Sequence, residues 1–388
     1  MAADVDLLIL GGGCAGLSLA RELATFGPRA PSTCVIEQRA QYEEDRTWCF
    51  WGNDTAMSAQ LVEQRWSHVQ LRAAGDLVDF SCGDHPYQMI RSSRFYAEAL
   101  QALSGAPQLR VERAVTILSE PQWVQGMWQI DTTSGCRRGR MLIDTRPGRL
   151  PVTPRESPTL WQSFFGKEII CEAPVFNPDT ATLMDFFDDQ RGRIAFTYLL
   201  PFTAYRALIE VTLFDKSLAT PADLSQLLDQ QIGLRTGLHR FTVERSEHGI
   251  LPMGLPPPRR VRHGASGPFL RVGLMHGAAR ASTGYAFQRI QRWAQSCAAQ
   301  LVAGTPLQAH EPDPLLTRSM DRLFLSLLRR CPDTASTLFL SMFRRADPGG
   351  LMRFLTDRAS LRDTFGIISS LPALPFIRQI GYDLVHPR

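Results

Sequence analysis

The first forty residues alternate between apolar runs and one segment with helical periodicity. A strand is predicted over Val5–Leu10, a helix over the segment "LSLARELA", and a second strand over "TCVIE" at residues 33–37. Strand, helix and strand in this order predict a βαβ unit with two parallel strands. Further strands are predicted within residues 139–148 and from Phe269 onward, where an amphipathic helix follows.

Another apolar stretch, "LLPFTAYRALIEVTLFD" at residues 199–215, predicts a turn followed by a strand that carries one carboxyl group, Glu210. Because side chains alternate along a strand, its face is shared with Leu208, Thr212 and Phe214, while the opposite face carries Ala207, Ile209, Val211 and Leu213. Both faces are largely apolar, so burial is predicted to raise the pKa of Glu210 and keep it protonated at neutral pH. The alternatives are that Glu210 lies at a sheet edge, or that it pairs with an arginine such as Arg206 or Arg193.

From Leu315 onward the pattern becomes helical, with Leu, Phe, Met and Ile at helix spacing and Arg between them. Residues 317–388 contain 11 Arg and no Lys against 6 Asp and no Glu. Basic amphipathic helices bind anionic lipid surfaces. We therefore expect this region to dock on a membrane, to close a substrate pocket as a helical cap, or to do both.

Composition narrows the function. The chain has 388 residues, 44% of them apolar, and a net charge of +4 without basic runs interleaved with aromatics, which argues against nucleic-acid binding. The eight cysteines are scattered without a CxxC pair, so neither a metal site nor a disulfide framework is indicated. No apolar run is long enough to span a bilayer, and the first residues lack a signal-peptide pattern. A cytoplasmic protein, peripherally associated with the inner face of the cell membrane, is expected.

The turn after the first strand reads Gly11-x-Gly13-x-x-Gly16, with Ala15 inside it. In such a turn Gly11 allows the tight bend, Gly13 lets a pyrophosphate approach the backbone, and Gly16 allows close packing of helix on strand. Glu37 ends the second strand, 21 residues after Gly16, where an acid hydrogen-bonds ribose hydroxyls. The complete unit predicts a dinucleotide site.

Two later segments favour FAD over NAD as the dinucleotide. The strand within residues 139–148 carries Asp144 and resembles the strand that returns to the cofactor in many FAD-dependent proteins. A loop of small residues containing Gly277, Thr283 and Gly284 precedes the amphipathic helix predicted after Phe269, and we expect the N-terminus of that helix to face phosphates. An ordinary connection between strand and helix is the alternative for that loop.

With these segments in order, the sequence resembles bacterial lycopene cyclases of the soluble flavoprotein type, the lycopene beta-cyclases. The similar blocks, which follow the order seen in the family, are "DLLILGGGCAGLSLA", "DRTWCFW", "YQMIRSSRFYAEAL", "WQSFFGKEI", "LMDF", "FTYLLPFTAYRALIEVT", "ERSEHGILPMG" and "STGYAFQRIQ". This chain departs from the family at Arg46, where many members have His, and in "HGAARASTGYAF", where His276 stands apart from the Thr-Gly-Tyr segment.

The resemblance implies an activity and a role for Glu210. In that family the Leu-Ile-Glu-x-Thr block carries the acid that transfers a proton. The implied reaction is cyclisation of the acyclic end groups of lycopene or a related carotenoid to β-ionone-type rings, without net redox change, with reduced FAD as cofactor and NAD(P)H as the ultimate reductant. Aromatic faces would stabilise the carbocation. The candidate residues for this are Trp48, Phe50, Trp51, Phe196, Tyr198 and Tyr285.

Alternatives remain for the acid and for the activity. Asp185 and Glu247 lie near the matching blocks and rank below Glu210 as acids. A flavin monooxygenase of the aromatic hydroxylase type would share the dinucleotide unit, although "GLMHGAARA" lacks the Asp expected beside its flavin. A third alternative is a carotenoid-binding or membrane-associated protein without catalysis.

The expected fold is an α/β, Rossmann-like FAD-binding fold with an inserted antiparallel β-sheet and a helical C-terminal region. We expect residues 1–75, 130–160 and 265–303 to form the FAD-binding domain, residues 80–125 and 161–262 the substrate-binding domain, and residues 315–388 the helical cap. The Pro-rich segment 255–268 is expected to be a loop.

Overall fold

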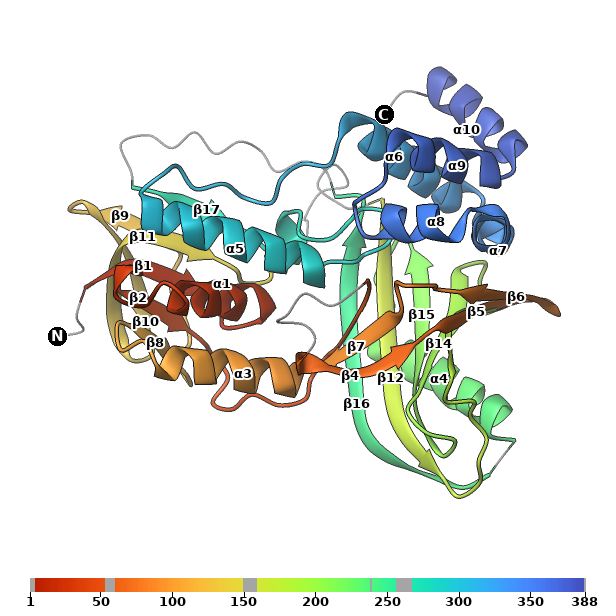
Figure 1. Cartoon of the computed structure of the whole chain (residues 1–388), viewed down its shortest axis with the longest axis horizontal. Coiled ribbons are helices and arrows are strands. Elements are labelled where there is room, and N and C mark those ends of the chain that lie inside the picture. The colour runs from red at the N-terminus through yellow and green to blue at the C-terminus, as the bar shows by residue number, and fades with distance from the viewer. Residues whose placement is uncertain (1–3, 53–59, 149–158, 238, 256–266, 387–388) are drawn as a thin grey trace.

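The computed structural model describes residues 4–52, 60–148, 159–237, 239–255 and 267–386. Two large sheets lie next to each other, and the C-terminal helices cover one end of the second (Figure 1). The α/β fold class predicted from the sequence, with several sheets and a helical C-terminal region, is confirmed. Most of the predicted 255–268 loop lies outside the described residues.

The first sheet has seven strands and contains the predicted βαβ unit. The strands are β8 (Leu109–Glu112), β2 (Thr33–Ile36), β1 (Val5–Leu10), β11 (Gly135–Asp144), β10 (Met127–Thr132) and β9 (Gln122–Val124) in this order, with β17 (Phe269–Arg271) paired to β11. Strand β1 runs parallel to both β2 and β11. The carboxyl ends of these strands therefore meet at one edge, where ligands bind in open α/β sheets.

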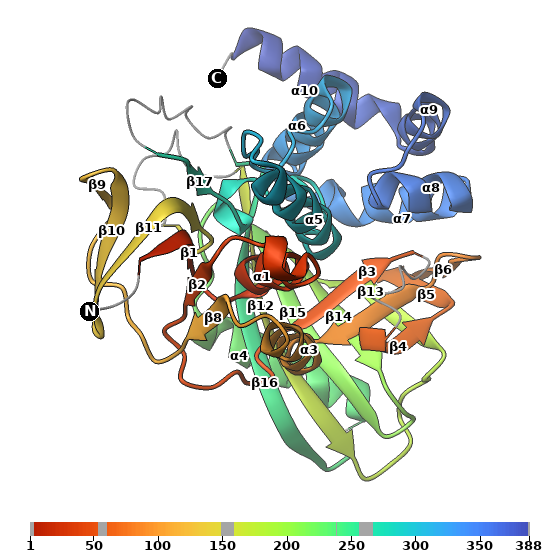
Figure 2. The same cartoon turned by 60° about the vertical axis from the view of Figure 1, so that its left-hand side comes forward.

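Three helices pack side by side next to the parallel strands. Helix α1 (Cys14–Ala24) lies between α5 (Phe287–Ala303) and α3 (Ser92–Ser104) (Figures 1 and 2). Its Leu19 and Leu23 are fully buried in one cluster with Ala294 of α5. This packing fixes the N-termini of α1 and α5 near the carboxyl end of β1.

The second sheet also has seven strands. Its order is β16 (Phe241–Met253), β12 (Leu160–Cys171), β15 (Arg206–Asp215), β14 (Ile194–Pro201), β13 (Thr180–Phe187), β5 (His68–Ala73) and β6 (Asp76–Ser81). All neighbours are antiparallel except β13 and β5. One face packs on α4 (Pro221–Thr236) through the apolar side chains of β15 that were predicted to share a face. The other face carries Glu210.

The strand pairing differs from the expected division of the chain at two places. Strands β8 and β9 fall in the segment expected in the substrate-binding sheet, yet they pair within the first sheet. Strand β5 falls in the segment expected in the cofactor domain, yet it pairs with β13 in the second sheet. Pairing between distant segments depends on long-range register, which local periodicity does not encode.

A small sheet connects the two large ones, and helices complete the fold. Strand β7 (Tyr87–Arg91) pairs with β3 (Thr47–Trp51) and β4 (Val62–Trp66). The C-terminal region consists of α6 (Leu315–Arg330), α7 (Ala335–Arg345), α8 (Pro348–Leu355), α9 (Leu361–Ser370) and α10 (Ala373–Val385). Within the described residues, every helix is too short or too polar to cross a bilayer.

Candidate functional site

One large cavity joins the glycine-rich turn to the second sheet. Its volume is about 920 Å³. Gly11, Gly13 and Glu37 line it from the first sheet, and Glu210 and Glu247 line it from the second. Side chains of α7, including Phe339, Met342 and Phe343, also contribute to its wall. The cavity therefore brings the predicted dinucleotide turn and the buried acid to one space.

The glycines of the turn have the geometry that a dinucleotide needs. Gly11 adopts a φ of +96°, a conformation that L side chains rarely adopt. A Cβ on Gly16 would lie 2.0 Å from the carbonyl oxygen of Gly11, so only glycine permits this contact of helix and strand. A Cβ on Gly13 would meet no atom within 4 Å, since this position faces open space. The turn thus leaves room for a ligand where a pyrophosphate is expected.

Glu37 is held as a carboxylate beside the turn. Burial alone would raise its pKa, but hydrogen bonds from Arg39 and from the Gly12 backbone lower the pKa. The Gly12 N–H donates to Oε2 at 2.8 Å, and the Arg39 N–H and Nε donate to Oε1 at 2.7 and 3.0 Å. The sequence analysis missed Arg39, whose guanidinium shares this carboxylate. Nearby, a Cβ on Gly12 would lie 2.4 Å from the hydroxyl of Tyr42.

The helix N-termini at this end of the cavity fit a dinucleotide. The N-termini of α1 and α5 have no side-chain cap, and Ala15, Ala286 and Phe287 from their first turns line the cavity. Uncapped helix N-termini attract phosphate groups.

The remaining residues predicted to contact the cofactor divide into two groups. Thr283 and Gly284 line the cavity, and Gly284 has a φ of +73°. Asp144, at the end of β11, lies outside the lining and pairs with Arg146 at 2.8 Å. Gly16 packs behind the turn, and Gly277 lies in the loop after β17, also outside the lining. The structure therefore brings together Gly11, Gly13, Ala15, Glu37, Thr283 and Gly284.

Glu210 lies in the middle of β15 on the cavity face, and its carboxyl group is buried. Burial raises the pKa of Glu210 to about 8, with a further contribution from the negative charge of Glu247, and the Thr212 hydroxyl opposes the shift by a 2.7 Å hydrogen bond to Oε1. Both arginines considered as partners are engaged elsewhere. Arg206 donates to Glu168 at 2.6 Å, and Arg193 donates to Asp189 at 2.5 Å. The group is therefore a protonated acid at neutral pH.

Glu210 belongs to a row of residues that runs across four strands. In register, Glu247 of β16 is opposite Gly166 of β12, Gly166 is opposite Glu210, and Glu210 is opposite Tyr198 of β14. Side chains that are directly opposite share a face of the sheet. The Tyr198 hydroxyl lies 2.8 Å from that of Tyr87, and burial raises the pKa of Tyr198 well above its ordinary range. The row therefore places two carboxyl groups and a neutral phenol along the cavity.

A buried ion-pair cluster supports Glu247. Arg245 Nη1 donates to Glu247 Oε2 at 2.7 Å, and its Nε donates to Glu168 Oε2 at 2.8 Å. Glu168 is fully buried and also accepts from Arg91 and Arg206. Burial alone would raise the pKa of Glu168, but Arg91 and Arg245 lower it to about 2. The sequence analysis missed this cluster, for which the charged alternation in "ERSEHG" was the available signal.

Of the aromatic residues predicted to contact substrate, four line the cavity and Phe50 does not. Trp48, Phe196, Tyr198 and Tyr285 line the cavity. Phe50 is buried outside it, stacked on Phe287 with the ring centroids 5.4 Å apart. Asp185, the other candidate acid, lies outside the lining and pairs with Arg235 at 2.6 Å.

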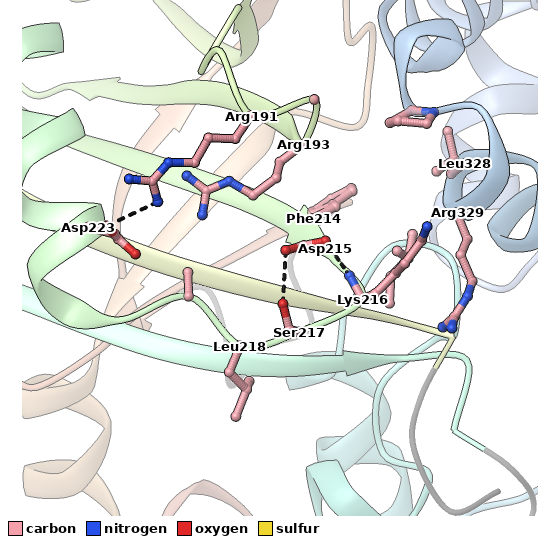
Figure 3. A pocket seen from close by; sticks show the side chains of 14 residues that line it. Arg191, Arg193, Phe214, Asp215, Lys216, Ser217, Leu218, Asp223, Leu328 and Arg329 are labelled. Atoms are coloured by element: carbon pink, nitrogen blue, oxygen red, sulfur yellow. Dashed lines mark hydrogen bonds and ion pairs between the residues drawn. The ribbon is translucent and has the colours of Figure 1, made fainter. Parts of the chain in front are cut away.

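A second cavity of about 440 Å³ lies between the loop after β13, the turn after β15 and the end of α6 (Figure 3). Two of its arginines form ion pairs with aspartates. Arg191 pairs with Asp223 at 3.2 Å, and Arg193 pairs with Asp189. Neither the glycine-rich turn nor Glu210 contributes to this cavity, so it is separate from the candidate site.

Comparison with known proteins adds a family to this geometry. A family model described as "Lycopene cyclase protein" matches residues 6–380. A lycopene beta-cyclase from Paracoccus sp. (strain N81106 / MBIC 01143) is 31% identical over 228 residues, which cover 55% of this chain and 57% of that protein. The match thus spans little more than half the length of this curated relative.

Solved structures share the fold at low identity. A geranylgeranyl bacteriochlorophyll reductase-like protein from Thermoplasma acidophilum superposes with a TM-score of 0.60 at 11% identity, over 98% of this chain and 99% of that one. Aklavinone-11 hydroxylase, solved in a ternary complex with FAD and aklavinone, gives a TM-score of 0.58 at 15% identity, over 86% of this chain and 71% of that one. At such identities the likeness shows the fold alone.

Proposed function

This chain belongs to the lycopene cyclase family, and we propose that it cyclises the acyclic end groups of lycopene or a related carotenoid to β-ionone-type rings in carotenoid biosynthesis. The observation that carries the proposal is a carboxyl group, Glu210, kept protonated in the wall of a cavity that also contains a dinucleotide turn. Family membership suggests which activity to expect. The buried, protonated Glu210 provides the proton donor that this activity requires.

Cyclisation requires an acid in a dry site. A proton must be added to a terminal carbon-carbon double bond, the ring must close through a carbocation, and a neighbouring proton must be lost. Because the pKa of Glu210 is about 8, most of this group carries its proton at pH 7. Trp48, Phe196 and Tyr285 offer ring faces to a cation in the same cavity.

We assign FAD to the glycine-rich end of the cavity. Gly11, Gly13 and Glu37 would hold its dinucleotide part, and Thr283 and Gly284, in the loop before α5, would lie along it. FAD in its reduced form, with NAD(P)H as the source of electrons, would supply fixed negative charge next to the cavity. Such charge favours a carbocation electrostatically. Glu37 argues for ribose hydroxyls rather than a 2′-phosphate at its position.

The apolar substrate implies access from a lipid surface. Helix α9 exposes Leu361, Phe365 and Ile368, and α10 exposes Leu374, Ile377 and Leu384. Each set follows helical spacing, so each forms one apolar face. Figure 1 shows α10 at the outer edge of the helical region, away from the sheets. Exposed Arg362 and Arg378 add positive charge, which suits anionic lipid. We propose a peripheral position on the inner face of the cell membrane.

The test is anaerobic incubation of the purified protein with FAD, NADPH and lycopene in liposomes, followed by chromatography of the pigments. The proposal predicts cyclic products of unchanged mass without oxygen. A flavin monooxygenase of the aromatic hydroxylase type requires oxygen, so it would leave lycopene uncyclised under these conditions and would consume oxygen only in an aerobic assay. A non-catalytic carotenoid-binding protein would leave it unchanged with or without oxygen.

A further inference from the structure

We propose that Glu247 is the base of the reaction, the group that takes the proton lost after ring closure, and that it acts with Glu210 as a separated acid and base pair. This inference rests on the proposed cyclase function and deepens it. The resemblance of the sequence assigns a role to Glu210 and none to Glu247.

The register of the sheet places Glu210 and Glu247 on either side of a glycine, Gly166. Glu210 and Glu247 are both directly opposite Gly166, from β15 and β16 respectively. With neighbouring strands about 4.8 Å apart, their backbones are separated by roughly 10 Å. A Cβ on Gly166 would lie 3.2 Å from Leu208 Cδ1, 3.4 Å from Glu210 Cβ and 3.5 Å from Glu247 Cγ. Glycine therefore lets the side chains of Glu210 and Glu247 approach each other over this position, and both of them line the cavity in which the substrate would lie.

The two carboxyl groups have different hydrogen-bond and ion-pair partners. Glu210 accepts only from the Thr212 hydroxyl in the part of the chain that the structure describes. Glu247 forms an ion pair with Arg245 and accepts from the Thr47 hydroxyl at 2.8 Å, both on Oε2. Within the described residues this leaves Oε1 for the cavity, which Glu247 lines. A neutral carboxyl beside an ionised one is the pairing that assigns an acid and a base in other enzymes.

The ion pair of Glu247 is rigidly placed. Arg245 is 13% exposed at its side chain and is held on its other side by the fully buried Glu168. Arg245 Nη2 also donates to Thr47 Oγ1 at 2.6 Å, and that hydroxyl in turn donates to Glu247. Because these bonds hold the Glu247 carboxylate in place, it cannot move to the position of the Glu210 carboxyl group. The proton is therefore removed from one defined side of the ring.

The steps balance without an oxidant or reductant. The O–H bond of Glu210 breaks, and the π pair of the terminal double bond takes the proton to form a C–H bond. The π pair of a second double bond forms the ring C–C bond. The C–H bond next to the resulting cation then breaks, its pair becomes the new double bond, and the proton goes to Glu247 Oε1. Glu210 ends as a carboxylate and Glu247 as an acid, and proton exchange through water restores both.

The test compares Glu247→Gln with Glu247→Asp and with the control Glu244→Gln, which removes an exposed carboxylate from the same strand. Each protein is loaded with FAD and assayed anaerobically with NADPH and lycopene, and flavin content, cyclisation rate and the type of ring are measured. We expect E247Q to retain FAD and to be slower by roughly 10²- to 10⁴-fold. In this variant the cyclised cation should lose its proton from other carbons, giving altered ring types. We expect E247D, whose carboxylate is one methylene further from the substrate, to recover at least tenfold over E247Q with the wild-type ring but to stay well below the wild-type rate, and E244Q to match the wild type.

Several outcomes would overturn the inference while leaving the proposed function intact. One is an active wild type with E247Q within threefold of it. Another is a slower E247Q that loses flavin in proportion and still makes only the wild-type ring, which would be a purely structural role. If E247Q does not fold, E247D decides, since wild-type rate in E247D would show that the position of the carboxylate is immaterial. A wild type that forms no rings would contradict both the function and the inference.

Discussion

The Thr212 hydroxyl donates a 2.7 Å hydrogen bond to Oε1 of Glu210, two residues away on the same face of β15. This bond favours the ionised form and lowers a pKa that burial and the charge of Glu247 raise to about 8. The pKa of Glu210 therefore results from opposing contributions, and removing the Thr212 hydroxyl should raise it.

Cyclisation should depend on pH through Glu210. The charged and titratable groups near it include Glu247 of β16, itself paired with Arg245, Tyr198 of β14 on the same face of the sheet, and Cys49 in the cavity lining. Because the reaction needs the protonated acid, the rate should fall as pH rises through about 8. In Thr212→Val the pKa should rise, so this decline should begin at higher pH. A pH profile of the rate with bound substrate measures both, and an unshifted decline in Thr212→Val would contradict the assignment.

Stability should also depend on Glu210. Its pKa is raised in the folded protein, so the folded state holds a proton that the unfolded state releases between the ordinary pKa of 4.5 and about 8. The free energy of unfolding should therefore fall as pH rises through this window, by about 1.4 kcal/mol per pH unit from this group. Glu210→Gln has no titrating group here, so its free energy of unfolding should not fall in this way. Denaturant unfolding should therefore show the stability of the variant rising relative to that of the wild type from pH 5 to 8. The same pH dependence of the unfolding free energy in both proteins would contradict a buried neutral acid.

Gly13→Val tests the dinucleotide turn. Gly13 has a φ of −78° and a ψ of −163°, and a Cβ there meets no atom within 4 Å, so valine fits the fold. Valine would occupy the space assigned to the pyrophosphate, and FAD should be lost at unchanged thermal stability of the apoprotein. Absorbance after desalting measures the bound flavin.

The control for that variant is Gly105→Ala, at an exposed glycine after α3 whose added Cβ approaches nothing closer than 3.8 Å. It should retain FAD fully. Flavin content in Gly13→Val equal to that of the control would place the cofactor elsewhere.

Membrane binding should depend on the exposed apolar faces of α9 and α10. Phe365 and Ile377 are each 62% exposed. Replacing both with Ser removes apolar surface worth about 1.5–3 kcal/mol per side chain if fully inserted, so vesicle affinity should fall about tenfold or more. Cosedimentation with anionic vesicles measures this, and high salt should weaken binding in part. Leu118→Ser, at a 65% exposed position on another part of the molecule, should have no effect.

The parts of this site that depend on local sequence patterns could be predicted from the sequence. The βαβ unit with its glycines and the two-faced strand around Glu210 follow from short-range periodicity, and both were predicted. The row from Glu247 through Gly166 to Glu210 was not, because it depends on the register of three strands that are far apart in sequence. The same holds for Glu168, whose arginine partners at 91, 206 and 245 meet only in the folded chain.

The departures of the chain from its family lie close to this site. Arg46 stands beside Thr47, whose hydroxyl donates to Glu247, and the Arg46 backbone N–H donates a 3.0 Å hydrogen bond to Ser92 Oγ. The altered loop before α5 still brings Thr283, Gly284 and Tyr285 to the cavity. The positions that differ therefore leave the carboxyl groups and the cavity lining in place.

The most direct test of the central claim is the cyclisation rate of FAD-loaded Glu210→Gln protein with lycopene in liposomes, measured beside the wild type and Glu244→Gln. Glutamine keeps the shape of the side chain and removes the transferable proton. The account predicts full flavin content with a rate reduced by roughly 10²- to 10⁴-fold or more, while Glu244→Gln matches the wild type. A folded, FAD-loaded Glu210→Gln protein that forms rings at the wild-type rate would contradict it.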